Sequence, residues 1–222
     1  MARQLAFDLP VRESRSRGDF FVSDANALAL TRLDDATLWP NHKLVLVGPE
    51  GAGKTHLAHV WADATGALLL TPDVLEALDV PGTDCAVALD TADILTANQE
   101  EAVFHLHNHL SANALAFLLV ARTPPAQWKL TLPDLKSRMV AADTVRIEAP
   151  DDALLSAVMV KQFADRQLAV APNVIAWLVD HMDRSFASAQ RMVDALDKAA
   201  LAEGRAVTRP LAQKVAAALA HE

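Results

Sequence analysis

A glycine-rich loop set between an apolar run and a helical segment constrains the fold of this chain most strongly. Residues 48–55 read Gly-Pro-Glu-Gly-Ala-Gly-Lys-Thr, after the apolar run 43–47 and before a segment with helical character. This is the pattern G-x-x-x-x-G-K-[ST], in the context of strand, loop and helix that it requires. Glycines in such a loop let backbone N–H groups approach phosphate oxygens without interference from a Cβ atom. The sequence therefore predicts a phosphate-binding loop within an α/β fold.

Side chains of this loop indicate a nucleotide with a divalent cation. The helix N-terminus adds a partial positive charge, and Lys54 would contact the outer phosphates. Thr55 would offer its hydroxyl to Mg²⁺. A glycine-rich turn without a ligand would explain the glycines, but not a lysine and a hydroxyl at this spacing. We therefore expect ADP or ATP with Mg²⁺ as cofactors. The expected cofactor-binding residues of this segment are Gly48, Pro49, Glu50, Gly51, Ala52, Gly53, Lys54, Thr55 and His56.

A second apolar run, residues 85–90, ends in an acidic residue. As a strand of a parallel sheet it would carry Asp90 to the edge where the loop lies, so that Asp90 and Thr55 would hold Mg²⁺. The alternative is that Asp90 only caps the next segment. The following residue is Thr91, where ATP-hydrolysing P-loop proteins usually have a second acid. A hydroxyl is a poor base for the attacking water, so intrinsic ATP hydrolysis should be weak or absent unless Asp93 substitutes.

The pattern of the chain changes near Pro150. Before it, apolar runs alternate with helical segments, which predicts βαβ units and a parallel sheet covered on both faces. The runs are 43–47, 66–71, 85–90, 114–121 and 144–147, and the clearest helices are 54–65 and 99–110. After it, only helical patterns occur, at 151–166, 172–182, 185–202 and 208–220. We expect a flexible tail over 1–18, a nucleotide-binding α/β domain over 19–149 and a helical domain over 150–222.

Composition excludes several classes of protein. The formal net charge of −8 argues against a large nucleic-acid interface, which normally needs a basic surface. The single cysteine, Cys85, cannot form an internal disulfide bond. Residues 1–25 are charged and contain no visible signal peptide, and no apolar stretch reaches membrane-spanning length. We expect a cytoplasmic protein.

Together these motifs resemble those of the AAA+ ATPases, and among them those of the DnaA/Hda family. The similarity covers nearly the whole chain and follows the family in order and spacing. Besides the loop and Asp90, three later segments resemble family motifs. Residues 99–108 resemble the helix that follows the Walker B strand, residues 121–125 resemble the sensor 1 region, and residues 132–138 resemble box VII. The resemblance implies an AAA+ P-loop parallel sheet flanked by helices, with a small C-terminal helical lid.

Within the family, the pattern is closer to Hda than to the replication initiator DnaA. DnaA has a helix-turn-helix DNA-binding domain beyond its lid, whereas this sequence ends with the lid. The resemblance implies a regulator that binds an adenine nucleotide, promotes hydrolysis of DnaA-bound ATP and limits re-initiation. DnaA would be a partner, with no membrane and no strong direct DNA binding, and assembly into homo-oligomers stays open.

The resemblance also assigns roles to residues away from the loop. Arg138 in box VII would be the catalytic residue, acting in trans as an arginine finger on ATP held by DnaA. The alternative for Arg138 is a surface ion pair with Asp134 or Asp143. Phe21 and Val22 would line the adenine pocket, or else they are ordinary core residues of an N-terminal segment.

The lid departs from the family pattern at sensor 2. The position of the sensor 2 arginine holds Ala187, with Arg184 and Arg191 on the same helical face as candidates to replace it. Loss of this arginine together with the second acid favours a protein that binds nucleotide to set its shape.

Near the N-terminus, residues 4–9 resemble the peptide by which Hda docks to the sliding clamp of the replicative polymerase. Gln4 would be a polar anchor, and Leu5, Phe7 and Leu9 would enter an apolar pocket of the clamp. Because a flexible peptide loses entropy when it binds, the affinity should be modest. The alternative is that this short apolar segment packs on its own domain.

Two other classes of function compete with this interpretation. A small P-loop kinase would need phosphate-clamping arginines in its lid, whereas the lid here is alanine-rich with scattered arginines. A DnaA-like DNA-associated factor would bind DNA in a salt-sensitive way. Turnover of a small acceptor would favour the first class, and DNA binding by the isolated protein the second.

Overall fold

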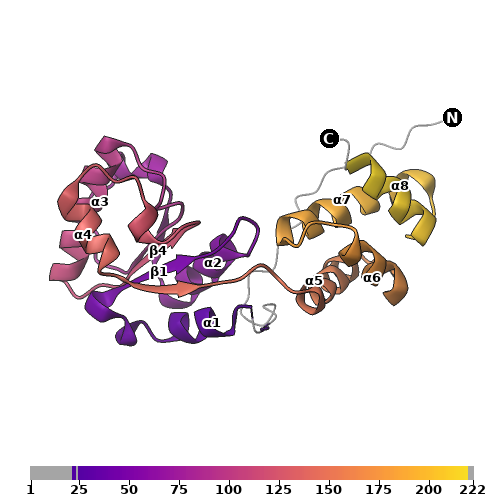
Figure 1. Cartoon of the computed structure of the whole chain (residues 1–222), viewed down its shortest axis with the longest axis horizontal. Coiled ribbons are helices and arrows are strands. Elements are labelled where there is room, and N and C mark those ends of the chain that lie inside the picture. The colour runs from indigo at the N-terminus through magenta and orange to yellow at the C-terminus, as the bar shows by residue number, and fades with distance from the viewer. Residues whose placement is uncertain (1–21, 24, 220–222) are drawn as a thin grey trace.

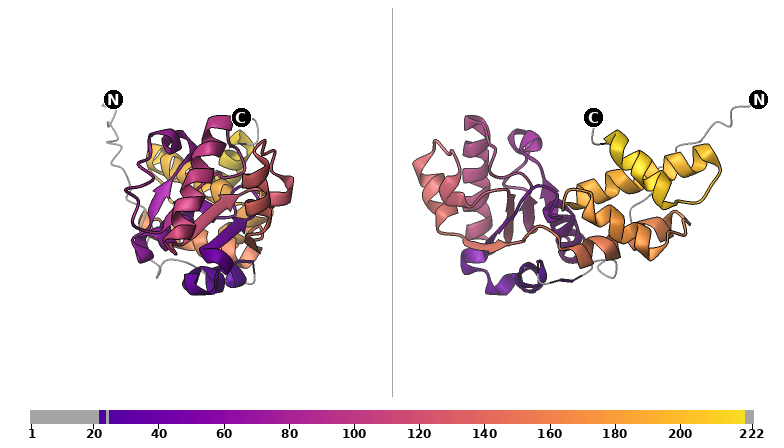
Figure 2. Two further views of the ribbon diagram at one scale, coloured as in Figure 1. Left: turned by 90° about the vertical axis from the view of Figure 1, so that its left-hand side faces the viewer. Right: turned by 45° about the vertical axis from the view of Figure 1, so that its right-hand side comes forward.

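The computed structural model describes residues 22–23 and 25–219, which form two parts joined by one extended segment (Figure 1). The first part is a sheet flanked by helices, and the second is a bundle of helices. The joining segment leaves the sheet after β5 (Asp143–Arg146) and enters the bundle at α5 (Asp152–Asp165). The right-hand view of Figure 2 also shows the bundle beside the sheet part. The predicted tail, residues 1–18, lies outside the described residues.

The described residues contain a five-stranded sheet in the order β2-β3-β4-β1-β5. Its strands are β1 (Lys43–Val47), β2 (Leu68–Leu70), β3 (Val87–Leu89), β4 (Phe117–Ala121) and β5 (Asp143–Arg146). Every pairing is parallel. All residues of β1 and β4 are buried, as expected for central strands covered on both faces. The five predicted runs are confirmed as strands, with β2, β3 and β4 shorter than predicted and β5 starting one residue earlier.

Alternate side chains of β1 enter two different hydrophobic clusters. Val45 and Val47 pack with residues of α3 (Ala97–Ala112) and α4 (Pro133–Val140). Leu44 and Leu46 pack with residues of α1 (Ala27–Asp34) and α2 (Lys54–Thr65). Successive residues of a strand point to opposite faces, so one helix pair covers each face of the sheet. The predicted class of a parallel sheet flanked by helices is confirmed.

The helix α4 is the element that the sequence pattern does not predict. It has eight residues, of which only Leu135 and Met139 are buried, too few to give a clear helical period. Its start is marked by Pro133 at the first helical position, where no N–H is needed. Its neighbour α3 begins with a capping box, in which the Thr96 side chain accepts from the Gln99 backbone and the Gln99 side chain accepts from the Thr96 backbone. Four 3₁₀ segments occur among the described residues: η2 (Ala36–Leu38), η3 (Pro40–His42), η4 (Pro72–Ala77) and η5 (Pro125–Gln127).

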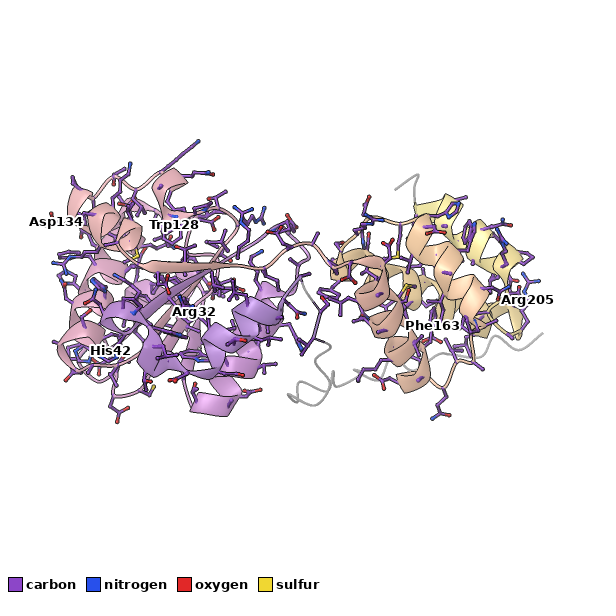
Figure 3. All side chains as sticks on the ribbon, turned by 60° about the horizontal axis from the view of Figure 1, so that its bottom comes forward. Arg32, His42, Trp128, Asp134, Phe163 and Arg205 are labelled. Carbon is purple, nitrogen blue, oxygen red and sulfur yellow. The ribbon has the colours of Figure 1, made fainter. Side chains whose placement is uncertain are left out.

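The helical patterns after Pro150 are confirmed as four helices with a core of their own. They are α5 (Asp152–Asp165), α6 (Pro172–Asp180), α7 (Phe186–Glu203) and α8 (Arg209–Leu219). Asp151 caps α5, because its side chain accepts a hydrogen bond from the N–H of Leu154. The core of the bundle is centred on residues such as Phe163, which lies far from Trp128 of the sheet part (Figure 3). Within the described part of the chain, the helices are too short or too polar to cross a membrane.

Candidate nucleotide site and the opposite edge of the sheet

The glycine-rich loop connects the carboxyl end of β1 to α2. A Cβ atom on Gly48 would lie 2.5 Å from the backbone oxygen of Ile147, so the close approach of the two segments requires glycine. Gly51 and Gly53 have left-handed backbones, with φ of 73° and 89°. Gly53 is also the N-cap residue of α2. The glycines therefore fix a loop that ends at the unpaired N–H groups of a helix start, the usual place for an anion.

The structure brings Thr55 and Asp90 together beside this loop. Oγ1 of Thr55 donates a hydrogen bond of 2.6 Å to Oδ2 of Asp90, and Oδ1 accepts one of 2.8 Å from the N–H of Thr91. A hydroxyl and a carboxylate this close suit Mg²⁺, which prefers oxygen ligands and retains several waters. In the residues that the structure describes, no group of three or more His, Cys, Asp or Glu side chains could hold a metal ion. Phosphate oxygens and water would therefore complete the coordination of a cation here.

Lys54 folds back over the loop. Its Nζ donates a hydrogen bond of 2.8 Å to the carbonyl oxygen of Pro49. Burial lowers the pKa of Lys54 below its ordinary value, an effect that the carboxylate of Asp90 partly offsets. The guanidinium of Arg122 lowers the same pKa further. An anion between Lys54 and the loop would relieve this mutual repulsion of two cations.

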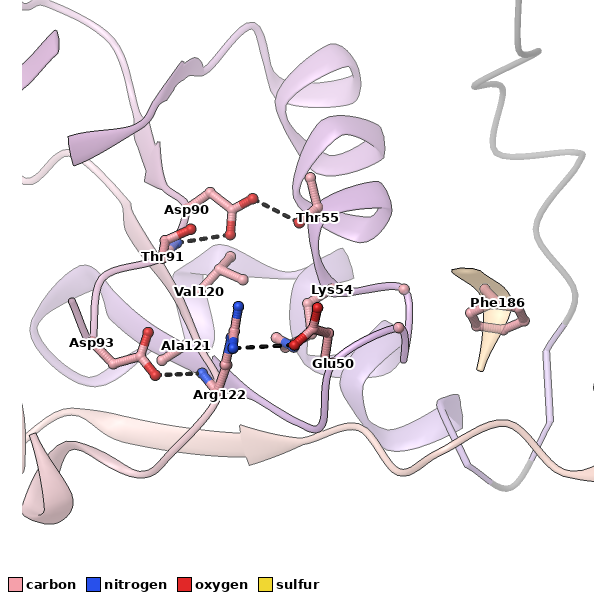
Figure 4. Close-up of a pocket in the computed structure, with 12 residues that line it drawn as sticks. Glu50, Lys54, Thr55, Asp90, Thr91, Asp93, Val120, Ala121, Arg122 and Phe186 are labelled. Carbon is pink, nitrogen blue, oxygen red and sulfur yellow. Dashed lines mark hydrogen bonds and ion pairs between the residues drawn. The ribbon is translucent and has the colours of Figure 1, made fainter. Parts of the chain in front are cut away.

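A pocket of about 330 Å³ opens above the loop (Figure 4). This volume lies within the range of small-molecule sites, which starts at roughly 300 Å³. Six of the predicted cofactor-binding residues line it: Glu50, Gly51, Gly53, Lys54, Thr55 and Asp90. Residues beyond the prediction complete it, and among them are Thr91, Asp93, Val120, Ala121, Arg122 and Phe186.

The other predicted cofactor-binding residues that the structure describes do not line this pocket. Gly48 packs against Ile147, Ala52 is buried, and Pro49 contributes its carbonyl oxygen to Lys54. His56 lies on α2, and Val22 is 68% exposed. Phe21 lies outside the described residues, as do Gln4, Leu5, Phe7 and Leu9 of the predicted clamp-binding peptide.

Arg122 lines the pocket and lies within the segment 121–125 that resembles sensor 1, but it was not predicted to bind the cofactor. It follows β4, the neighbour of β1, and its side chain forms an ion pair of 3.1 Å with Glu50. Its backbone N–H donates a hydrogen bond of 2.8 Å to Oδ2 of Asp93. Residues that follow adjacent parallel strands meet at one edge of the sheet, which is the signal that could have identified Arg122. Both side chains of the ion pair are more than half exposed, so a ligand could displace it at little cost.

The lid touches the loop at the start of α7. The N–H of Phe186 donates a hydrogen bond of 2.9 Å to the carbonyl oxygen of Gly51. A Cβ atom on Gly51 would lie 2.6 Å from Cβ of Ser185, and one on Gly53 would lie 3.1 Å from the ring of Phe186. Two glycines of the loop therefore allow the lid to approach, and Phe186 closes one side of the pocket in Figure 4.

The two candidate replacements for a sensor 2 arginine form contacts within the lid. Arg184 pairs with Asp152 at 2.9 Å, and Arg191 donates a hydrogen bond of 3.2 Å to Oγ of Ser188. Neither arginine lines the pocket, and Ala187 has no charge to offer it. On this side of the pocket the lid presents the ring of Phe186 instead of a cation.

Arg138 lies at the opposite edge of the sheet. It is in the last turn of α4, and its backbone oxygen accepts a hydrogen bond of 2.8 Å from Nζ of Lys43, the first residue of β1. The loop begins after Val47, the last residue of that strand. At roughly 3.3 Å per residue, Val47 lies about 13 Å from Lys43 along β1. Figure 1 shows α4 on the side of the sheet part that is farthest from the lid. Arg138 is exposed there and does not line the pocket of its own chain.

The surface ion pairs considered for Arg138 do not occur. The carboxylate of Asp143 pairs with Arg32 at 3.1 Å, and that of Asp134 has no ion pair with Arg138 among the described residues. Nη1 of Arg138 instead lies 3.4 Å from Nε2 of His107, and its guanidinium stacks over Phe104 with 5.1 Å to the ring centroid. Both partners are on α3.

Two buried titratable side chains, those of Lys43 and His107, lie at this edge. Lys43 is 4% exposed and His107 is 5% exposed. Burial, reinforced by the charge of Arg138, lowers the pKa of Lys43 to about 8. Burial, with the charges of Lys43 and Arg138, lowers the pKa of His107 to about 4. At neutral pH His107 is therefore uncharged beside two cations.

Residues 152–216 match the family model of the Hda lid domain. The whole structure is similar to domain III of the replication initiation protein DnaA from Thermotoga maritima, with a TM-score of 0.77 at 16% identity, over 93% of this chain and 97% of that chain. It is also similar to AMPPCP-bound DnaA from Aquifex aeolicus, with a TM-score of 0.65 at 18% identity, over 79% of this chain and 62% of that chain. A third similar structure is the Holliday junction branch migration motor RuvB from Thermotoga maritima, with a TM-score of 0.62 at 18% identity, over 78% of this chain and 60% of that chain.

These findings agree with the order of motifs along the chain. The lid match begins at the first residue of α5 and ends within α8. The similarity to DnaA domain III extends over the sheet part as well, because it covers 93% of the chain. The chain thus has the fold of DnaA domain III, and its residues 152–216 match the Hda lid domain, in agreement with the resemblance to the DnaA/Hda family of AAA+ proteins.

Proposed function

We propose that this protein is an Hda-like regulator of replication initiation that promotes hydrolysis of the ATP bound to DnaA. The match of residues 152–216 to the Hda lid domain carries this proposal. The fold shared with DnaA domain III supports it, because the proposed reaction joins two AAA+ modules, one holding ATP and the other supplying an arginine.

The protein itself binds an adenine nucleotide at the glycine-rich loop. The AMPPCP-bound DnaA structure supports this assignment, because its fold is similar to that of the chain. The N–H groups of the loop and of the start of α2 would bind phosphate oxygens. Lys54 would exchange the Pro49 carbonyl for the outer phosphates. Thr55 and Asp90 would hold Mg²⁺, which neutralises phosphate charge when bound.

Nucleotide bound in this pocket should turn over slowly. The residue after Asp90 is Thr91, whose hydroxyl is a poor general base. Asp93 lines the pocket, but one of its carboxylate oxygens already accepts the N–H of Arg122. With Ala187 in the lid, the site lacks the cation expected to respond to a third phosphate. Its nucleotide therefore serves to fix the lid against the loop.

Arg138 acts on the nucleotide of the partner. It lies at the amino edge of the sheet, while the loop lies at the carboxyl edge, so it cannot reach a nucleotide in its own chain. Its guanidinium is exposed and can donate several hydrogen bonds to a phosphoryl group in transfer, as arginine fingers do. Such a residue typically accelerates hydrolysis by about 10³-fold or more.

Docking to the sliding clamp through Gln4, Leu5, Phe7 and Leu9 rests on the sequence, because these residues lie outside the described part. A clamp loaded on DNA would bring the regulator to sites of replication in the cytoplasm. The peptide would add apolar anchors to a partner pocket, and its affinity would be modest because it orders on binding.

The test is a hydrolysis assay with ATP-bound DnaA, clamp loaded on DNA and the purified protein. We expect stimulation by the wild type, its loss with Arg138→Ala, and no loss with Lys136→Ala, a matched exposed cation on α4. The double variant Gln4→Ala/Leu5→Ala should lose retention by immobilised clamp. Stimulation that survives Arg138→Ala would move the finger elsewhere, and unchanged retention would remove the docking assignment.

A further inference from the structure

The side chain of Arg138 rests on two residues of α3 that lie one helical turn apart. Phe104 offers its ring face at 5.1 Å from the guanidinium carbon, and His107 offers Nε2 at 3.4 Å from Nη1. Residues three apart on a helix lie on the same face, so the two contacts meet one side of the arginine. A cation over an aromatic face and a hydrogen bond together restrict a side chain that is otherwise free to rotate.

The protonation state of His107 suits this contact. A guanidinium only donates hydrogen bonds, so the ring nitrogen that faces Arg138 must accept. The low pKa of His107, about 4, keeps the ring neutral at physiological pH, with one accepting nitrogen. Oγ of Ser111 lies 3.3 Å from Nδ1, one turn further along α3. The Nδ1–H therefore donates to Ser111, which leaves Nε2 to accept from Arg138.

The same helix also fixes the beginning of α4. Glu100 is 2% exposed, and its carboxylate accepts hydrogen bonds from the N–H and the hydroxyl of Thr131 and from the N–H of Leu132. Leu132 is the N-cap residue of α4. At the other end, Lys43 donates to the carbonyl oxygen of Arg138. The backbone of α4 is therefore held at both ends before its arginine meets a partner.

We propose that Phe104 and His107 are positioning residues that hold the Arg138 guanidinium ready for the nucleotide of the partner. This inference rests on the proposed role of Arg138 in trans. Held on one side by α3, the guanidinium presents its remaining N–H groups outward, and the loss of rotamer freedom is incurred at folding and not at the transition state.

The experiment compares variants that keep or remove each contact. Phe104→Leu keeps apolar volume without an aromatic face, and Phe104→Tyr keeps the face. His107→Leu removes the acceptor, and His107→Gln keeps one. His109→Gln is the matched control, because His109 is on the same helix but contacts the carbonyl oxygen of Thr83.

The readout is stimulation of ATP hydrolysis on DnaA as a function of regulator concentration. We expect Phe104→Leu and His107→Leu to lower the maximal stimulated rate about tenfold or more, because a small misplacement of a catalytic group is costly. The concentration for half-maximal stimulation and the thermal unfolding temperature should stay close to those of His109→Gln. Phe104→Tyr and His107→Gln should recover most of the rate. A general packing defect would shift the unfolding temperature and would not be rescued in this pattern.

A second readout does not depend on stimulation. In the free protein, the ring of Phe104 should shift the NMR resonances of the Arg138 side chain, and Phe104→Leu should return them to values typical of a free arginine. Unshifted Arg138 resonances in the wild type would overturn the inference. So would wild-type maximal rates in both leucine variants while Arg138→Ala abolishes stimulation, a result that leaves the proposed function intact. Stimulation that survives Arg138→Ala would overturn the inference together with the proposed role of Arg138 in trans.

Discussion

The two edges of the sheet are built by different means. At the carboxyl edge, the backbone of the glycine-rich loop forms one side of the pocket, and polar groups there contact one another: Glu50 with Arg122, Lys54 with the carbonyl oxygen of Pro49, and Thr55 with Asp90. At the amino edge, Arg138 is held by side chains from α3 and by Lys43 from β1. At the carboxyl edge, a bound ligand would replace contacts between protein groups. At the amino edge, the contacts stay in place and leave the guanidinium of Arg138 exposed. This difference agrees with the proposal that one edge binds a ligand and the other acts on a partner.

The sharpest way to break this comparison is to remove the cation of the carboxyl edge. Lys54→Ala should weaken binding of ADP with Mg²⁺ by at least about 100-fold, close to 3 kcal/mol, since a charged partner of the phosphates is lost. Isothermal titration calorimetry gives the affinity. Lys129→Ala, an exposed lysine outside the pocket, and Arg138→Ala should both bind normally. Equal affinity of Lys54→Ala and wild type would exclude this edge as the nucleotide-binding site.

The amino edge should show a pH dependence that the loop does not. The pKa of His107 is lowered from 6.5 to about 4, so its contribution to stability is complete above pH 6.5 and is lost as the pH falls toward 4. The groups that face it are Lys43, Arg138 and Ser111. Since one pKa unit corresponds to about 1.4 kcal/mol, the loss amounts to at most about 3 kcal/mol.

Urea unfolding of the wild type and of His107→Gln, at about pH 7 and about pH 4.5, measures this difference. The variant should lose less stability on acidification, because it lacks the group that must take up a proton against two cations. The remaining loss, common to both proteins, does not come from His107. Identical losses would mean that His107 is charged as easily in the folded state as in the unfolded chain.

A smaller effect tests whether backbone shape is what builds the carboxyl edge. Gly48→Ala should destabilise the protein by about 2 kcal/mol or more, because its Cβ would lie 2.5 Å from the backbone oxygen of Ile147. Gly66→Ala is the control, with a left-handed backbone but nothing within 4 Å of its Cβ, and should cost about 1 kcal/mol. Denaturant unfolding measures both, and equal costs would mean that the segments can separate freely.

The smallest expected effect concerns the ion pair across the pocket. A double-mutant cycle with Glu50→Gln and Arg122→Gln should give a coupling below about 1 kcal/mol in the apo protein, because both side chains are largely exposed. A low coupling supports an edge whose contacts are exchanged for ligand. A coupling of several kcal/mol would mean that a ligand cannot easily displace the ion pair, so that both edges would keep their internal contacts.

Sequence reasoning identified the features whose cause lies within a short stretch of chain. The loop is a local pattern of glycines followed by Lys54 and Thr55, and its geometry follows from the backbone freedom of glycine. The strands are apolar runs because a parallel sheet is buried on both faces, and the lid helices show a clear period. Asp90 was also identified, because an acid at the end of such a run must reach the same edge as the loop.

The residues that escaped prediction reach their sites through tertiary structure. Arg122 and Phe186 join the pocket from β4 and from the lid, and a sequence does not give the side-chain direction of either. Arg138 itself was predicted, but its contact with His107 joins positions 31 apart, and α4 has too few buried residues for its period to appear. Tertiary structure also explains why Arg138 has no ion pair with Asp143. The carboxylate of Asp143 pairs with Arg32 instead.

We propose that Arg138, at one edge of the sheet, acts on a nucleotide held by another molecule. The most direct test of this proposal is the single-turnover hydrolysis of labelled ATP preloaded on DnaA, with saturating wild-type or Arg138→Ala protein and clamp on DNA. We expect a rate with Arg138→Ala equal to that of DnaA alone, at unchanged affinity of the variant for its own nucleotide. Hydrolysis by Arg138→Ala at the wild-type rate would contradict it.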